Sequence, residues 1–203
     1  MAFIFNMRKS FCTVVLLVSL ATLGRAQDLE PKRFRIIEKG FLIGVGHGID
    51  SLNLPEGNYV PTFFIGHIGF SLTKKPNSNK GIFTFNLEPQ LNPVFIRKAE
   101  SSKTELEFGL NMGFQHIYPI TKNIYSYILI SAGPHFISVN TVRLARGFCF
   151  SDNLGAGLYV ALNKSLRLNL GFRLRHLSNA ELKSPNHGIN TFNYHIGLSK
   201  ALW

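Results

Sequence analysis

The sequence predicts an all-β protein, an eight-stranded antiparallel transmembrane β-barrel, from three observations. In residues 166–174 every second side chain is apolar, and arginines stand among the residues between them. Because successive side chains of a strand point to opposite faces, this segment has an apolar face and a charged face. Similar segments recur along the chain, and after residue 26 no run approaches the roughly 18 uncharged apolar residues of a membrane helix. Apolar residues outside and polar residues inside are typical of a barrel in lipid.

Residues 1–26 have the pattern of an export signal. Arg8 and Lys9 precede an apolar run at residues 11–23, and Ala26 supplies the small residue that a signal peptidase requires. The apolar run is too short for a membrane-spanning helix. We therefore expect a signal peptide that is cleaved from the mature protein.

Residues 27–203, which we expect to fold as one outer-membrane barrel domain, contain 19 basic and 11 acidic side chains. An exported chain rarely meets nucleic acid, so the lipids of an anionic membrane surface are the expected partners. Cys149 is the only cysteine of this domain, which leaves no internal disulfide. The histidines show no metal-ligand spacing, and we expect no metal and no cofactor.

The first two expected strands follow a charged, aperiodic lead at residues 27–39. They cover residues 40–48 and 59–73, and a polar stretch with Pro55 and Gly57 separates them. A turn-rich run then precedes the next pair of strands.

The third and fourth expected strands cover residues 81–96 and 104–118, with a charged loop at residues 97–103 between them. Both alternate apolar with polar side chains. Pro89 and Pro93 lie within the third strand and predict bulges or irregular pairing, because proline cannot donate to the ladder.

The last four expected strands cover residues 124–139, 150–162, 166–178 and 190–203. Short turns alternate with longer polar loops between the strands. Because the number of strands is even, both ends of the chain should lie on the same side of the barrel. Trp203 provides the terminal aromatic residue that is common in bacterial outer-membrane barrels, although Lys200 interrupts the last apolar stripe.

Charged residues on the faces opposite the apolar stripes should lie in the lumen. They are Glu105, Glu107, Arg167, Arg173 and Arg175. Isolated charges in a packed lumen would be costly, so we expect them to form ion pairs with a structural role.

His176 and Ser178 continue the outward face of residues 166–174 where the apolar stripe ends. An imidazole next to a hydroxyl can remove its proton and create a nucleophile. At the membrane boundary, such a pair would meet the ester groups of a lipid. By spacing alone, however, a His-x-Ser pair is more often two surface residues.

The motif at residues 176–180, HLSNA, followed by PNHGIN at residues 185–190, resembles the lipid A 3-O-deacylases of the PagL type. The resemblance implies an outer-membrane enzyme that hydrolyses an ester-linked acyl chain of lipopolysaccharide.

The same resemblance implies a role for four residues of the motif. Ser178 would be the nucleophile and His176 its base, while Asn179 and Asn186 would help to hold the oxyanion.

The chain departs from the family pattern at Asn190, where the family has an acidic residue that orients the histidine. An amide can fix the tautomer of an imidazole, but it offers no full charge to the imidazolium. We expect Asn190 to take this position as the third catalytic residue. Glu181 in the preceding loop is the alternative source of a carboxylate.

Basic residues lie in the expected loops. They are Arg97, Lys98, Arg143, Arg146 and Lys183. Each could contact lipid A phosphates or simply face solvent.

Three other functions stay open at this point. A non-enzymatic small barrel with a structural or adhesive role would fit the loss of the acid, and a soluble lipocalin-type barrel would fit the strand count. An acyltransferase would use the same acyl-enzyme with an acceptor other than water. The sequence also leaves open whether the protein forms a homodimer.

Overall fold

The computed structural model describes residues 34–49, 58–73, 81–98 and 101–202. The expected signal peptide at residues 1–26 and the terminal Trp203 lie outside this part of the chain. Within it, no helix has the length and apolar character needed to cross a membrane.

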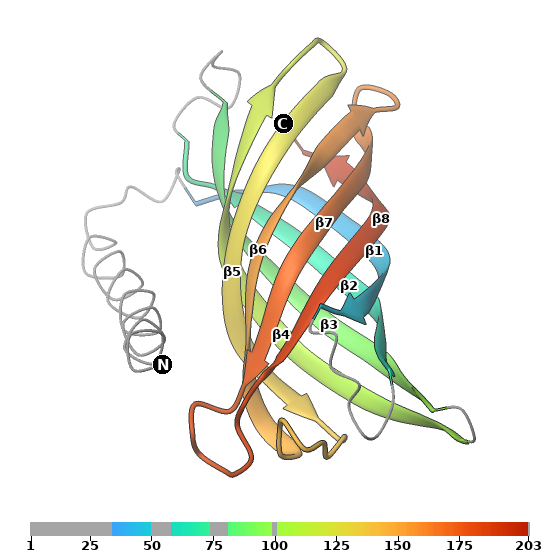
Figure 1. Cartoon of the computed structure of the whole chain (residues 1–203). Coiled ribbons are helices and arrows are strands. Elements are labelled where there is room, and N and C mark those ends of the chain that lie inside the picture. The colour runs from blue at the N-terminus through green and yellow to red at the C-terminus, as the bar shows by residue number, and fades with distance from the viewer. Residues whose placement is uncertain (1–33, 50–57, 74–80, 99–100, 203) are drawn as a thin grey trace. The chain divides into compact units, whose positions relative to one another are not determined.

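The strands pair antiparallel in chain order, and β1 also pairs with β8, which closes the barrel (Figure 1). They are β1 (Ile36–Gly48), β2 (Asn58–Ser71), β3 (Ile82–Lys98), β4 (Ser101–Pro119), β5 (Ile124–Ile137), β6 (Gly147–Ala161), β7 (Leu166–Ser178) and β8 (Ile189–Ala201). The eight-stranded antiparallel barrel is confirmed. We call the end that carries the connections after β1, β3, β5 and β7 the loop end, and the opposite end the turn end.

The faces of the strands are inverted relative to a water-soluble barrel. On β7, Phe172 and Leu174 are exposed, whereas Arg173 and Arg175 between and beside them are buried in the lumen. An exposed apolar surface suits lipid. A lipocalin-type barrel, which needs its apolar residues inside, is therefore excluded.

The lumen is a packed interior in which polar side chains lie among three apolar clusters. The cluster at the loop end comprises Tyr59, Val94, Ile96, Ile137, Val139, Leu144, Cys149, Leu177 and Ile189. The cluster at the turn end comprises Ile37, Ile82, Ile117, Tyr127, Leu129 and Tyr159. A third, smaller cluster comprises Leu42, Phe63 and Ile65 on the middle of β1 and β2. The expectation of a polar lumen thus holds only in part.

Two Arg–Glu ion pairs lie among the polar side chains of the lumen. Arg173 donates hydrogen bonds of 2.5 and 2.9 Å to the two carboxylate oxygens of Glu88. Arg175 donates one of 2.7 Å to Glu107, whose other oxygen accepts from the Tyr59 hydroxyl. These buried charges are paired, as the cost of an isolated charge requires.

Glu105 does not join this luminal network, contrary to our expectation. It accepts a hydrogen bond of 2.5 Å from Ser138 and pairs with the exposed Lys103. The reason is the length of the β3–β4 hairpin, whose pairing continues to Lys98 and Ser101 through the expected loop. Figure 1 shows this hairpin reaching beyond its neighbours at the loop end.

One strand boundary needed correction, and the prediction of bulges or irregular pairing in β3 is confirmed in its second form. β1 begins at Ile36 inside the expected lead, because a register shift between Ile36 and Glu38 hides the alternation. In β3, the prolines interrupt the pairing with β2, while the register on either side is unchanged, so the pairing is irregular but no bulge forms.

Candidate active site

His176 and Ser178 lie at the loop end of β7 on the face of Phe172 and Leu174, and both are partly exposed. Their α-carbons are two residues apart on one strand, a separation of roughly 7 Å. In the described part of the chain no hydrogen bond joins the Ser178 hydroxyl to His176. Catalytic hydrogen bonds are often long before substrate binds, so this separation is compatible with proton transfer.

The imidazole of His176 is fixed by β8. Its Nδ1 lies 2.6 Å from Oδ1 of Asn190, the residue paired with it across the β7–β8 ladder. Because an amide oxygen only accepts, Nδ1 carries the proton in this arrangement. Nε2 is then left with a lone pair, which is the state that a general base needs.

Gly188 provides the space for this ring. Its backbone has a φ of +74°, and a Cβ added there would lie 2.4 Å from Cε1 of His176. A larger residue would displace the imidazole and also strain the backbone. The sequence motif includes Gly188, but the sequence alone does not show why a glycine is needed there.

Asn179 and Asn186 hold the β7–β8 loop together next to Ser178. The backbone N–H of Asn179 donates a 2.8 Å hydrogen bond to Oδ1 of Asn186, and the Asn179 side chain donates one of 2.6 Å to the carbonyl of Lys183. The Asn179 side chain is thus used within the loop. The Nδ2 group of Asn186 makes no hydrogen bond to another described residue, which leaves it available as a donor.

Glu181 lies in the tight turn that follows. The N–H of Leu182 donates a 3.0 Å hydrogen bond to the carbonyl of Asn179, and Ala180 and Glu181 between them have φ values of 52° and 65°. The Glu181 side chain is exposed, and it makes no interaction with His176 in the part of the chain that the structure describes.

The loop between β5 and β6 clamps the β7–β8 loop. Arg143 donates through Nε to the carbonyl of Gly188 at 2.8 Å and through Nη2 to that of His187 at 3.3 Å. A bridge between Leu144 and Asn186 joins the backbones of the two loops. Arg143, expected in contact with phosphates or solvent, thus binds the carbonyl of the glycine that lies against His176.

Asp152 of β6 is a neighbour that the sequence analysis missed. It is paired with His176 across the β6–β7 ladder, and its carboxylate interacts electrostatically with the imidazole. Asp152, His176 and Asn190 therefore occupy one rung on three adjacent strands. One signal was present in the sequence: Asp152 is an acid on the otherwise apolar face of its strand, between Phe150 and Leu154.

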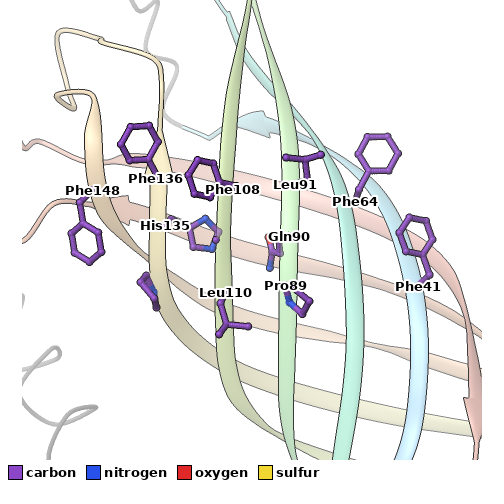
Figure 2. Close-up of a pocket in the computed structure, with 12 residues that line it drawn as sticks. Phe41, Phe64, Pro89, Gln90, Leu91, Phe108, Leu110, His135, Phe136 and Phe148 are labelled. Carbon is purple, nitrogen blue, oxygen red and sulfur yellow. The ribbon is translucent and has the colours of Figure 1, made fainter.

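A shallow groove of about 750 Å³ is lined by residues of β1 to β6. Figure 2 shows its lining side chains distributed over successive strands. The residues that form its apolar walls are Phe41, Phe64, Pro89, Leu91, Phe108, Leu110, Pro134, Phe136 and Phe148.

The strand register connects the groove to Ser178. Phe150 is paired with Ser178 on one side and with Pro134 on the other. The β4–β5 register sets Leu110 opposite Pro134, and Leu110 pairs with Pro89. This row starts at the loop end of β7 and reaches the middle of β3, so it runs from the candidate nucleophile toward the centre of the barrel wall.

None of the described residues form a group of three or more His, Cys, Asp or Glu side chains that could hold a metal ion.

Comparisons with known proteins identify a similar family and similar barrels. Residues 100–199 match the family model described as lipid A 3-O-deacylase (PagL). The crystal structure of the outer membrane enzyme PagL is similar with 20% identity and a TM-score of 0.58, over 78% of this chain and 97% of that one.

Two other solved barrels are similar at lower scores. Neisserial surface protein A has 11% identity and a TM-score of 0.49, over 82% of this chain and 96% of its own. The attachment invasion locus protein Ail of Yersinia pestis has 11% identity and a TM-score of 0.47, over 82% and 99%. No curated protein sequence matches the chain.

Proposed function

Because this chain is a PagL-like outer-membrane β-barrel that matches the lipid A 3-O-deacylase family over residues 100–199, we propose that it hydrolyses an ester-linked acyl chain of lipid A. The family match supports a hydrolase that removes an acyl chain. It also implies that the substrate is lipopolysaccharide in the outer membrane. The finer proposal concerns which groups of this chain act on the ester, and where.

In the first step, the Ser178 hydroxyl oxygen attacks the ester carbonyl while Nε2 of His176 accepts its proton. Asn190 holds the opposite ring nitrogen, and the Asn186 amide donates to the oxygen on which negative charge develops. The intermediate collapses when His176 returns the proton to the departing lipid A hydroxyl. The acyl chain is then an ester of Ser178.

In the second step, water attacks the acyl-serine and His176 takes a proton from it. Collapse of this second intermediate frees the Ser178 oxygen, which recovers the proton from the imidazolium, and releases a fatty acid. The two steps together regenerate Ser178 and His176, and neither step is a redox reaction.

The observation that carries this proposal is the hydrogen bond between His176 and Asn190 on the face that Ser178 shares. Lipid A can reach that face laterally from the membrane. The apolar groove supports a place for the acyl chain, since Pro134 of its lining is joined to Ser178 by strand pairing through Phe150.

The test measures the mass of lipid A by mass spectrometry, either after extraction from cells or after incubation with purified protein. Wild-type protein should release a fatty acid, whereas Ser178→Ala and His176→Ala should fold and release none. Ser126→Ala and His116→Ala are matched controls, because these side chains are partly exposed on the outward face near the turn end. Release by either site variant at the wild-type rate would contradict the mechanism.

The same spectra separate the rivals. Unchanged lipid A with wild-type protein would favour the structural or adhesive barrel. Loss of the acyl chain from lipid A, with its appearance on another lipid, would favour an acyltransferase.

A further inference from the structure

Asp152 poses a question that the proposed mechanism does not answer. Its strand is apolar on the outward face, where Phe150 and Leu154 flank it and are both exposed. The structure describes several acidic residues on strands, and among them only Asp152 lies on the outward face. A charged side chain facing lipid is destabilising, so its presence needs a reason.

The strand register supplies a partner for this charge. Asp152 is directly opposite His176, and residues opposite each other in an antiparallel ladder have Cβ atoms roughly 4.5–5.5 Å apart. The carboxylate interacts electrostatically with the imidazole, and it makes no hydrogen bond to another described residue. In the part of the chain that the structure describes, no other side chain competes with His176 for this carboxylate through a hydrogen bond.

The other side of His176 lacks such a charge. Asn190 accepts the Nδ1 proton at 2.6 Å, which fixes the ring, but its amide is neutral. When Ser178 loses its proton, an imidazolium forms. Asn190 on β8 orients this ring but does not neutralise its positive charge. Glu181, the carboxylate in the loop, is exposed and has no described interaction with the ring.

We propose that orientation and charge compensation are divided between two strands: Asn190 on β8 orients His176, and Asp152 on β6 stabilises its charged form. Asp152 is then a positioning and electrostatic residue that acts through His176. The inference rests on the proposed deacylase function and adds to it the source of the negative charge.

The experiment measures kcat and KM for deacylation of lipid A by purified, folded protein, with folding checked by heat-modifiable migration. Asp152→Asn should lower kcat roughly 10- to 100-fold, as expected for losing a charge at this distance near a protein surface, and leave KM within about twofold. Asp152→Glu, which keeps the charge, should retain most of the activity. Glu181→Gln is the matched control and should leave kcat unchanged.

A rescue experiment separates this role from a structural one. Placing a carboxylate on the other side of the ring, by Asn190→Asp in the Asp152→Asn background, should restore kcat at least tenfold. The same Asn190→Asp change in the wild-type background should raise kcat much less, because the two charges then serve one imidazolium and their effects are not additive. A merely structural Asp152 would give no such rescue.

Three results would overturn the inference. They are unchanged kcat in Asp152→Asn, an equal effect of Asn190→Asp in both backgrounds, or loss of activity in Glu181→Gln instead. In each of these cases Ser178→Ala would still abolish release, so the proposed function would stand. A wild-type protein without deacylase activity would overturn both.

Discussion

Arg175 and His176 are neighbours on β7, yet they belong to two different environments. Arg175 points into the lumen, where Glu107 and Thr191 accept hydrogen bonds from its guanidinium. His176 points outward, where Nδ1 binds Asn190 and no other described residue is hydrogen-bonded to Nε2, the nitrogen that takes the proton. The same strand thus carries satisfied charges on one face and reactive groups on the other.

The difference shows where function can reside in a small barrel. Charged groups enclosed among apolar clusters must be paired, and their pairing leaves little capacity for chemistry. Groups at the rim of the outward face meet both lipid and water. Substitutions in the lumen should therefore act mainly on stability, and substitutions at the rim mainly on catalysis.

Removing one partner of a luminal pair should damage stability most. Glu88→Ala leaves the Arg173 guanidinium buried without its carboxylate, and should lower the free energy of unfolding by about 3–5 kcal/mol. Urea-induced unfolding in detergent or lipid measures this loss. The double variant Glu88→Leu with Arg173→Leu removes both charges and should be much closer to wild type. If the single and double variants were equally unstable, the luminal charges would not act as a pair.

Gly188→Ala should lower kcat by roughly two orders of magnitude, because the new Cβ would occupy the space of the His176 ring and a small misplacement of a catalytic group is costly. The matched control is Gly147→Ala. Gly147 also has a positive φ, +119°, but its added Cβ would meet nothing within 4 Å. The control should lose some stability and keep its kcat. Equal kcat losses in both variants would assign the effect to backbone strain.

Arg143→Ala should lower kcat about tenfold, with a smaller effect on stability, because the guanidinium holds the carbonyls of His187 and Gly188 at the back of the site. Arg143→Lys should recover only part of the loss, since an ammonium lacks the planar fork. The steady-state rate of lipid A deacylation measures both. Arg146→Ala, in the same loop, serves as the control. A loss in binding rather than in kcat would instead favour contact with lipid A phosphate.

Much of the fold could be predicted from the period-two alternation. It assigned Arg173 and Phe172 to opposite faces, and it placed His176 and Ser178 on one face without any knowledge of their neighbours. It failed at β1, where the irregular register near Glu38 buries two consecutive side chains and removes the pattern.

The candidate site was only partly accessible for a related reason. Asn190 follows His176 across a single hairpin, so its position could be inferred from the chain order. Asp152 and Arg143 act across strand registers and loop contacts that the alternation within one strand does not encode. The role of Gly188 depends on a backbone angle and on the ring beside it.

The outward groove gives the smallest expected effect and sharpens the outer side of the comparison. Leu110→Trp would fill the groove along the row of paired residues that begins at Ser178. It should shift the preferred acyl chain to shorter lengths by a few-fold in kcat/KM, because each carbon excluded from the groove loses the burial of about one methylene. Competition between lipid A species of different chain length, read by mass spectrometry, measures the shift. Ile130→Trp places the same ring on an exposed outward position outside the groove lining and should leave the preference unchanged. Because bulk lipid contacts both positions, a shift confined to Leu110 would show that the acyl chain of the substrate follows the row from Ser178, and equal shifts in both variants would show that it does not.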